Sequence, residues 1–582
     1  MSKLALLRQK MLEKGLDAYV IYSGDAHQSE YVADYWLTRV WISGFAGSAG
    51  TVVVTANEAG LWTDGRYFIQ AEKELAGSGI DLFKMGEPDV PKYEEFLADK
   101  LPQNGKLGFD GRVLSASAFE TLKANLAHKQ ISFCYNEDIA GDLWADRPSP
   151  PTGKAFAHDI KFAGKTSAQK LAEVRAEMQK KRADVYIATA LDDIAWLTNT
   201  RGTDVAKTPV TIAYSLITMD DAFLFIDDKK ITDISLPDFN IQPYDAVFDY
   251  VVKYSAGKTL LYYDNGISVS LFEAIPKDTK AVKSPSIIAG LKAIKNEVEI
   301  KNLHNAFTKD GVVMVKFFKW LEECNDLPDE VGIQNKLSEL RIQQKDCLGD
   351  SFSTIAAYGK NAALPHYSPK PGACSQVKPE GLLLVDTGSQ YLDGTTDITR
   401  TVVMGNITDE MRKDFTLVLK AHIGLSKAKF AQGVAGCHID AIARQHMWEA
   451  GADYKHGTGH GIGFCLGVHE GPHNVGLNFN ETKLAPGMLI SNEPGLYKVG
   501  RHGVRTETVV LVKELEKNEH GTFLGFETLT LFPYDLRAVD MDMLTQGEKD
   551  YINSYHSRVY DTLLPHLSVD EAEWLKNAAK AI

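Results

Sequence analysis

The sequence predicts a multidomain protein of the α/β class, and three observations lead to this fold class. The chain has 582 residues, which corresponds to three domains at about 100–200 residues each. A pattern of one amphipathic helix followed by apolar strands occurs twice in the first half. The second half alternates helix pairs with strand-rich segments, which indicates an internal duplication. We therefore expect two similar α/β domains, residues 1–153 and 154–293, followed by an α+β domain of residues 294–582.

The first expected domain opens with a helix and a strand. A charged amphipathic helix is expected over Lys3–Gly15, and the apolar run Ala18–Tyr22 is expected to form a strand. Two more strand-like runs, Thr51–Thr55 and Leu61–Trp62, precede a helical pattern over Phe68–Ala76. This alternation is typical of a small layered α/β domain.

The second expected domain repeats that order. A Pro-rich run, Arg147–Gly153, marks the approach to it. A charged helix is expected over Ser167–Arg182, and DVYIATALDDIAWL from Asp184 then resembles DAYVIYSGDAHQSEY from Asp17. The strand-like run AYSLITM follows in the place that TVVVT has in the first domain. The two segments therefore predict domains of similar fold.

The third region has the longest helical patterns of the chain. One helix is expected from Lys292 through the run ending WLEE, and a second over Glu330–Gln344. After strand-rich sequence, two more helices are expected over Asp409–Ala431 and Ile439–Ala450. The last stretch, Gln546–Ile582, is expected to be helical and to serve in packing or dimerisation.

The composition favours an acidic soluble protein and argues against nucleic acid as a partner. The chain has 63 basic and 77 acidic residues, a net charge of -14, whereas phosphate binding requires a basic surface. Its six cysteines are scattered without a CxxC pair, so we expect reduced thiols. The N-terminus lacks the apolar core of a signal peptide, and no run is long enough to span a membrane. We expect a cytoplasmic protein with no membrane partner.

The sequence contains one HExxH motif, His469–His473, which is typical of zinc proteases. That motif binds zinc only on a helix, where the two histidines share one face. Here Gly471 and Pro472 lie inside it, and a proline within a helix costs about 3 kcal/mol or more. We therefore reject the zinc-protease interpretation.

Two aspartates lie on opposite sides of a predicted turn, and each is next to an apolar run. Asp386 ends the run LLLVD, and Asp397 precedes ITRTVV. A turn centred near Tyr391–Leu392 places these carboxylates directly opposite each other, with Cβ atoms about 4.5–5.5 Å apart. A turn centred on Asp393-Gly394 separates them by several residues. A metal site requires the first register or a bulge, because aspartates beside a loop are otherwise usually solvated turn residues.

Two glutamates have a similar arrangement further along the chain. Glu493 and Glu507 end and begin strand-like segments, with a glycine-containing loop between them. Folding about Gly500 places the two carboxylates opposite each other. Carboxylates that point into a core are costly unless they are paired or bound to metal. Two such pairs therefore indicate ions.

A glycine-rich loop with two histidines, His456 and His460, lies between the two carboxylate pairs. It does not fit a dinucleotide loop, because GxGxxG would require glycine at Ile462. Four carboxylates and one neutral imidazole balance the charge of two divalent cations. Oxygen ligands with one nitrogen suit Mn²⁺, Co²⁺ or Fe²⁺ better than a structural zinc site.

The ligand set of the M24 "pita-bread" metallopeptidases is similar, in order along the chain, to the set Asp386, Asp397, His460, Glu493 and Glu507. The surrounding sequence is similar to their cytosolic Xaa-Pro aminopeptidase branch at LPHYSP, VDTGSQYLDGTTDITRT, HGTGHGIG, VHEGP, NEPGLY and VRTET. SGDAHQSEY, ISGFAGSAGT and LWTDGRYF resemble the first domain of that branch, and ALDDIAWLTNTRG resembles its second. The resemblance spans the whole chain. It implies two creatinase-like N-terminal domains, a pita-bread catalytic domain with an internal pseudo-twofold repeat, and a homodimer.

The resemblance implies an aminopeptidase that releases the N-terminal residue of peptides with proline second. Two divalent metal ions, with Mn²⁺ first and Co²⁺, Fe²⁺ or Zn²⁺ as alternatives, would activate a hydroxide. The ligand positions are Asp386, Asp397, His460, Glu493 and Glu507. The catalytic positions are Glu493 as general base, His366 and His469 as substrate contacts, His456, and Arg505 as an orienting group. A structural salt bridge by Arg505 stays equally open. No role is assigned to His473 or Asp193, and Tyr367 is a candidate for the proline pocket.

Four alternatives differ in testable ways. A prolidase shares the ligand set but cleaves Xaa-Pro dipeptides rather than longer peptides. A catalytically silent relative acting as a binding module or histone chaperone lacks the ligands, all of which are present here. The same argument disfavours a metal-free creatinase-like hydrolase. A two-metal phosphoesterase usually has more histidine or asparagine ligands and basic phosphate clamps, which the sequence does not display.

Overall fold

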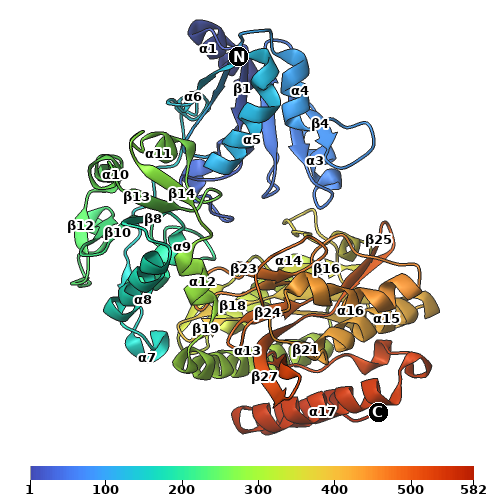
Figure 1. Ribbon diagram of the computed structural model, residues 1–582. Coiled ribbons are helices and arrows are strands. Elements are labelled where there is room, and N and C mark those ends of the chain that lie inside the picture. Colours follow the sequence, from blue (N-terminus) through green and yellow to red (C-terminus); the bar gives the residue numbers. More distant parts are fainter. Residues whose placement is uncertain (1) are drawn as a thin grey trace. The chain divides into compact units, whose positions relative to one another are not determined.

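The computed structural model describes residues 2–582, which divide into two compact units (Figure 1). The first unit comprises the chain up to Ala157 together with Lys165–Ile288, and the second comprises His158–Gly164 and Ala289–Ile582. Both six-stranded N-terminal sheets lie in the first unit, so the predicted division at residues 153 and 293 stays a prediction.

The two sheets of the first unit have the same topology, which confirms the predicted duplication. Their strand orders are β4-β3-β2-β1-β5-β6 and β12-β11-β10-β8-β13-β14. In each, the first strand runs antiparallel to the second strand and parallel to the fifth. The first sheet contains β1 (Ala18–Ile21), β2 (Thr51–Thr55), β3 (Ala59–Thr63), β4 (Asp81–Lys84), β5 (Lys106–Phe109) and β6 (Ser132–Cys134). The second contains β8 (Val185–Ala188), β10 (Tyr214–Thr218), β11 (Ala222–Phe225), β12 (Asn240–Gln242), β13 (Thr259–Tyr262) and β14 (Lys280–Lys283).

Helices cover the sheets of the first unit, so the central strands are buried on both faces. The helices predicted from Lys3 and Ser167 begin where expected, because side-chain caps precede them. Gly15, in the left-handed conformation, ends the first helix, and the Thr166 side chain caps α8. The main helices are α1 (Lys3–Lys14), α3 (Phe68–Glu74), α4 (Tyr93–Lys100), α5 (Ala116–Leu126), α8 (Ser167–Lys180), α9 (Leu191–Thr198) and α10 (Val247–Ser255).

The second unit has the predicted order of helix pair, strands, helix pair and strands. One prediction was wrong: the helix expected from Lys292 is interrupted. Asn296 is extended, and its side chain caps the next helix by accepting from Val298 N and Glu299 N. The helices are α12 (Ile287–Ala293), α13 (Glu297–Glu323), α14 (Glu330–Ile342), α15 (Asp409–Ser426), α16 (Gly436–Glu449), α17 (Gln546–Leu563) and α18 (Val569–Ala578).

Two other helical predictions need shorter bounds. α15 ends before Phe430–Ala431 because those two residues pair with a strand instead. The C-terminal helical stretch is divided into α17 and α18 by a short turn containing Pro565, which cannot continue an α-helix. In the part of the chain that is described, no helix combines the length and apolarity that a membrane crossing requires.

Strands at the centre of the second unit carry the candidate site, and one large apolar core packs α13–α18 against them. A three-stranded sheet has the order β16-β17-β20, and a six-stranded sheet has the order β21-β28-β27-β24-β22-β23. The three-stranded sheet contains β16 (Ile355–Tyr358), β17 (Leu382–Thr387) and β20 (Ile398–Val403). The six-stranded sheet contains β21 (Phe430–Ala431), β22 (Gly459–Gly461), β23 (Glu470–Val475), β24 (Leu489–Asn492), β27 (Thr508–Asn518) and β28 (Gly521–Thr528). A second three-stranded sheet contains β15 (Cys347–Asp350), β18 (Ser389–Tyr391) and β19 (Gly394–Thr395), and a two-stranded sheet contains β25 (Gly495–Lys498) and β26 (His502–Arg505).

The aspartate hairpin has a register between the two considered. Asp386 pairs with Thr399, and the β18–β19 pairs put the turn at Leu392–Asp393. Asp397 therefore lies diagonally across from Asp386 instead of directly opposite, so the predicted register was wrong. The tip is held by distant segments, since Leu392 O bonds to His158 Nε2 at 2.7 Å and the Asp393 carboxylate pairs with a lysine of α13.

The glutamate hairpin has the predicted register. Asn492 pairs with Thr508 on one side of the site, and Gly495 pairs with Arg505 on the other. Both ladders are centred on Gly500, so the glutamates between them, at 493 and 507, lie opposite each other. Local turn chemistry was sufficient here because the loop closes on itself.

Candidate metal centre

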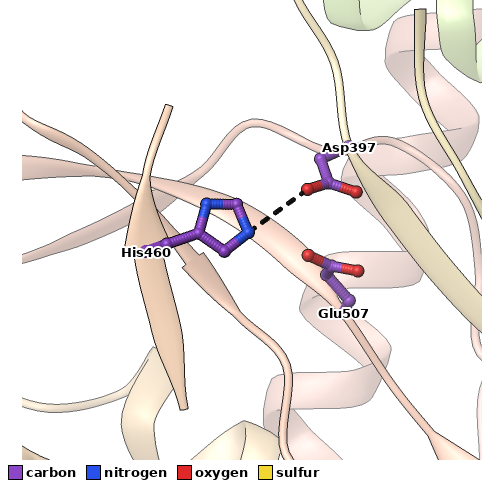
Figure 2. A group of neighbouring side chains, drawn as sticks. All are labelled: Asp397, His460 and Glu507. Carbon is purple, nitrogen blue, oxygen red and sulfur yellow. Dashed lines mark ion pairs between the residues drawn. The ribbon is translucent and has the colours of Figure 1, made fainter. Parts of the chain in front are cut away.

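Three side chains from separate strand regions meet at one point of the second unit (Figure 2). Asp397 lies between β19 and β20, His460 is in β22, and Glu507 lies between β26 and β27. Each offers one atom suited to binding a metal, and these atoms all lie within 4.8 Å of one another. In Figure 2 the His460 imidazole points toward both carboxylates. Residues more than 100 positions apart thus form one potential coordination site.

Glu493 and Asp386 complete the cluster. Glu493 Oε1 lies 3.4 Å from His460 Nε2, and Asp397 Oδ2 lies 3.6 Å from the same nitrogen. The Asp386 carboxylate accepts a hydrogen bond from Arg505 and is close enough to raise the pKa of Asp397. The structure therefore brings together the residues at all five positions that the sequence analysis assigned to metal binding.

The His460 imidazole has a defined tautomer. Its Nδ1 donates to Gly461 O at 2.9 Å, because a carbonyl oxygen can only accept. Nε2 is then the nitrogen with a free lone pair, and it faces the carboxylates. Burial lowers the pKa of this imidazole well below its usual range, and nearby His469 lowers it further. A neutral imidazole with its lone pair directed into an acidic cluster is the form that binds metal.

Burial and mutual repulsion raise the pKa values of three of the acidic groups. Burial raises the pKa of Asp397 well above its ordinary value, and Glu507, Asp386 and Glu493 raise it further. Burial likewise raises the pKa of Glu507, with Glu493 next among the causes. Burial raises the pKa of Glu493 to about 8, although Arg505 opposes that rise. Asp397, Glu493 and Glu507 are therefore expected to ionise together only in the presence of added positive charge.

Two of these acids also have an oxygen without a donor. Oδ1 of Asp386 and Oδ1 of Asp397 are buried, and neither has a hydrogen-bond partner within residues 2–582. Buried polar atoms in folded proteins are almost always satisfied by a donor or an ion. Two divalent cations would satisfy these oxygens and balance the four negative charges. The residues present therefore fit a pair of divalent ions.

The three other predicted histidines border the cluster in different ways. The His469 ring lies edge-on to His460, with 4.3 Å between ring centroids. His456 is bonded at both nitrogens: Nδ1 donates to Gly457 O at 2.8 Å, and Nε2 accepts from Tyr497 at 2.9 Å. His366 lies near enough to His456 to lower the pKa of that ring. Burial is the main cause of this shift, which takes the His456 pKa to about 3.

Arg505 organises one side of the site, together with two residues that sequence reasoning missed. Its guanidinium bonds to Asp386, to Tyr497 Oη at 2.8 Å and to Thr399 Oγ1 at 3.2 Å. Thr399 in turn donates to Glu507 Oε2 at 2.6 Å. Tyr497 thus links Arg505 to His456. The string NEPGLY contained Tyr497, but its partners are distant in sequence, so no local pattern indicated this role.

The remaining singled-out residues are not among the five clustered groups, although His473 lies close enough to His460 to lower the pKa of that imidazole, after burial and His469. His473 Nε2 donates to Leu489 O at 2.7 Å, and Glu470–Val475 form strand β23, which confirms that the HExxH motif is not helical. Asp193 lies in α9 of the first unit and accepts from Ser286. Tyr367 packs against a small apolar cluster in the second unit. No disulfide links any of the six cysteines, all of which lie within the described residues.

Fold and site together define the class of metallohydrolases with a carboxylate-rich two-ion centre. Comparisons with known proteins agree. Residues 301–514 match metallopeptidase family M24, and residues 522–582 match the C-terminal region of that family. Residues 3–136 and 146–299 match two models of the creatinase/prolidase N-terminal domain.

Similar proteins extend over the whole chain. A probable Xaa-Pro aminopeptidase P of Laccaria bicolor is 40% identical over 595 residues, covering 99% of this chain and 92% of the relative. Aminopeptidase P2 of Arabidopsis thaliana is 39% identical over 628 residues, covering 100% of this chain and 88% of the relative. The solved X-prolyl aminopeptidase of Caenorhabditis elegans, described as a cytosolic enzyme with a di-nuclear active site, has a TM-score of 0.94 at 32% identity, covering 100% and 99%.

The chain therefore belongs to metallopeptidase family M24. This membership confirms the predicted fold class, two creatinase-like N-terminal domains followed by a pita-bread catalytic domain.

Proposed function

We propose that this chain is a two-metal aminopeptidase that releases the N-terminal residue from peptides with proline at the second position. The observation that carries the proposal is the convergence of four carboxylates and one imidazole lone pair, with two buried oxygens that no donor satisfies. Relatives that match nearly the full chain are named Xaa-Pro aminopeptidase P, which supports this specificity. The substrates are therefore peptides that begin Xaa-Pro.

The metal ligands in this proposal are Asp386, Asp397, His460 Nε2, Glu493 and Glu507. When bound, two divalent ions polarise the scissile carbonyl and lower the pKa of a water. We assign Mn²⁺ first, because oxygen ligands with a single imidazole suit it, with Co²⁺, Fe²⁺ and Zn²⁺ as alternatives. His460 is fixed in the required tautomer by the Gly461 carbonyl.

Three residues act on the substrate and its protons. Glu493 takes a proton from the attacking water at a carboxylate oxygen and passes it to the leaving proline nitrogen. His469, edge-on to His460, donates to the carbonyl oxygen as negative charge develops there. His366 contacts the substrate from the loop on the other side of Arg505, whose guanidinium reaches Pro365 O at 3.5 Å.

His456 and Arg505 orient other side chains of the site, including two of the proposed metal ligands. Both nitrogens of His456 are already bonded within the protein, which favours a supporting role over substrate contact. His456 accepts a hydrogen bond from the Tyr497 hydroxyl, and that hydroxyl accepts one from Arg505. Arg505 orients Asp386 and, through Thr399, Glu507. In a buried site, loss of such an arginine leaves carboxylates unpaired, which is strongly destabilising.

We further propose a cytosolic homodimer. The location is supported by the description of the Caenorhabditis elegans neighbour as cytosolic. The dimer is supported by the family resemblance alone. Sedimentation velocity of the purified chain tests it, and a monomer at micromolar concentration contradicts it.

A substrate series tests the specificity. The metal-loaded enzyme is assayed with Xaa-Pro-Yaa, the dipeptide Xaa-Pro, and Xaa-Ala-Yaa, with Asp397→Ala as the inactive control. We expect hydrolysis of Xaa-Pro-Yaa alone. Cleavage confined to the dipeptide identifies a prolidase instead, and equal cleavage of Xaa-Ala-Yaa contradicts the role of proline.

A further inference from the structure

A buried carboxylate outside the metal centre, Glu330, collects an unusual number of hydrogen bonds. It is the first residue of α14, and none of its surface is exposed. Oε1 accepts from Tyr358 N at 2.7 Å and from Asn361 Nδ2 at 2.9 Å. Oε2 accepts from Tyr367 Oη and Ser375 N, both at 2.7 Å, and from Asn361 Nδ2 at 3.1 Å. All the donors are uncharged groups.

These donors lie along one loop, residues 358–375, which carries His366. Tyr358 ends β16 at the beginning of the loop, and Ser375 lies at its end. Tyr367 immediately follows His366, so one bond from Glu330 reaches the residue next to the histidine. Asn361 also donates to Ser375 Oγ at 2.9 Å. A single carboxylate therefore ties together both ends and the middle of the loop.

The first half of this loop has a second support in β26, whereas the second half is held by Glu330 and by Asp329, the residue before it. A Cβ atom on Gly503 of β26 would lie 1.8 Å from Ala362 O, so β26 runs directly against residues 359–363. Beyond Pro365, the hydrogen bonds that tie Tyr367 and Ser375 to the body of the unit converge on Glu330 and Asn361. The Glu330 side chain therefore holds the residue that directly follows His366.

We infer that Glu330 is a positioning residue for His366: it fixes the loop so that the imidazole faces the metal centre. This inference rests on the proposed contact of His366 with the substrate. Glu330 itself touches neither substrate nor metal ligands. A carboxylate is required because each of its oxygens accepts from at least two donors, and an amide would turn an NH₂ group toward donors on one side.

The first test is Glu330→Gln, which keeps size and removes one acceptor oxygen. We expect kcat for Xaa-Pro-Yaa to fall by about 10- to 100-fold, the effect of a small misplacement of a catalytic group. Because the proposed role of His366 is a contact with the substrate, kcat/KM should fall by at least the same factor as kcat. Metal content should stay at the wild-type level. A fall in stability with unchanged kcat per folded, metal-loaded chain overturns the inference.

A gentler variant covers the case in which Glu330→Gln does not fold. Tyr367→Phe removes the bond from Tyr367 to Glu330 and the one that Tyr367 accepts from Asn361, and leaves the other donors of Glu330 in place. We expect it to lower kcat several-fold without a change in metal content. Glu548→Gln is the matched control, since Glu548 is a buried carboxylate at the start of α17 that pairs with Lys420. Its kcat should equal that of the wild type.

A double-mutant cycle separates this inference from the proposed function. If Glu330 acts through His366, Glu330→Gln adds no further loss to His366→Ala. If the fold-loss of kcat in the double variant equals the product of the two single losses, the inference is contradicted. If His366→Ala retains wild-type kcat, the proposed role of His366 fails. If His366→Ala is impaired while both Glu330→Gln and Tyr367→Phe are not, only the role of Glu330 fails.

Discussion

At the scale of single residues, Asp397 shows how costly the metal centre is without its ions. Burial and three neighbouring carboxylates all raise its pKa, and its Oδ1 has no donor in the described chain. Such a group stabilises the protein only when positive charge is bound beside it. The site is therefore arranged for metal binding at the expense of stability in the metal-free protein.

The variant Asp397→Asn tests whether this carboxylate promotes metal binding and lowers the stability of the metal-free protein. It keeps the shape of the side chain, removes one negative charge and should lose bound metal and nearly all hydrolysis. In the metal-free state at pH 8, its free energy of unfolding should exceed that of metal-free wild type, because the variant lacks the charge that burial and the neighbouring carboxylates disfavour. Chemical denaturation after chelation measures this. A metal-free variant less stable than wild type contradicts the electrostatic account.

His556 of α17 gives a pH-dependent prediction away from the metal centre. Burial, with a smaller contribution from Arg400, lowers its pKa to about 4, and its Nε2 accepts from Tyr534 N at 3.0 Å. Between pH 6.5 and 4 the unfolded chain binds this proton and the folded chain does not, so stability is lost as pH falls. The destabilisation caused by His556→Gln should therefore shrink by about 2 kcal/mol between pH 7.5 and pH 5. Unfolding of both proteins at the two pH values measures it, and an unchanged difference contradicts it.

At the scale of elements, close strand packing places His460. A Cβ atom on Gly459 would lie 1.8 Å from Ser491 O, so β22 can approach β24 only with glycine at this position. The same approach lets His460 N donate to Ser491 Oγ at 2.9 Å. The glycine-rich loop therefore serves to bring the imidazole to the carboxylates.

Gly459→Ala should separate these strands. We expect the stability of the second unit to fall by about 1–3 kcal/mol through overpacking, with weakened metal binding because His460 moves. Gly290→Ala is the control, since no atom lies within 4 Å of the added Cβ and alanine favours the α12 helix. Calorimetry and metal titration of both variants measure the effects. Wild-type metal affinity in Gly459→Ala contradicts the packing argument.

Sequence reasoning succeeded where the controlling contacts were local. Caps such as Thr166 begin the predicted helices, and the hairpin about Gly500 sets its own register. It failed for the register of the hairpin that carries Asp386 and Asp397, because the hairpin tip is held by His158, which lies more than 200 residues earlier. The roles of Tyr497 and Glu330 were missed for the same reason, since their partners are distant in the chain.

At the scale of the whole molecule, duplication explains the layout. The first unit repeats one sheet topology, and the second alternates helix pairs with strands. All five residues of the candidate metal centre come from the second unit. Chelation should therefore lower the unfolding temperature of that unit, because a ligand at about 100 times its Kd contributes about 2.7 kcal/mol. Hydrogen exchange localises the change, and an effect confined to the first unit contradicts it.

The most direct test counts the metal ions. Elemental analysis of the purified chain, together with Xaa-Pro-Yaa hydrolysis, is compared between wild type and Asp397→Ala. We predict two divalent ions per wild-type chain, activity that disappears on chelation and returns with Mn²⁺, and a folded variant with neither bound metal nor turnover. Wild type that hydrolyses the peptide without bound metal, or a variant that matches it in metal and turnover, contradicts the two-ion centre.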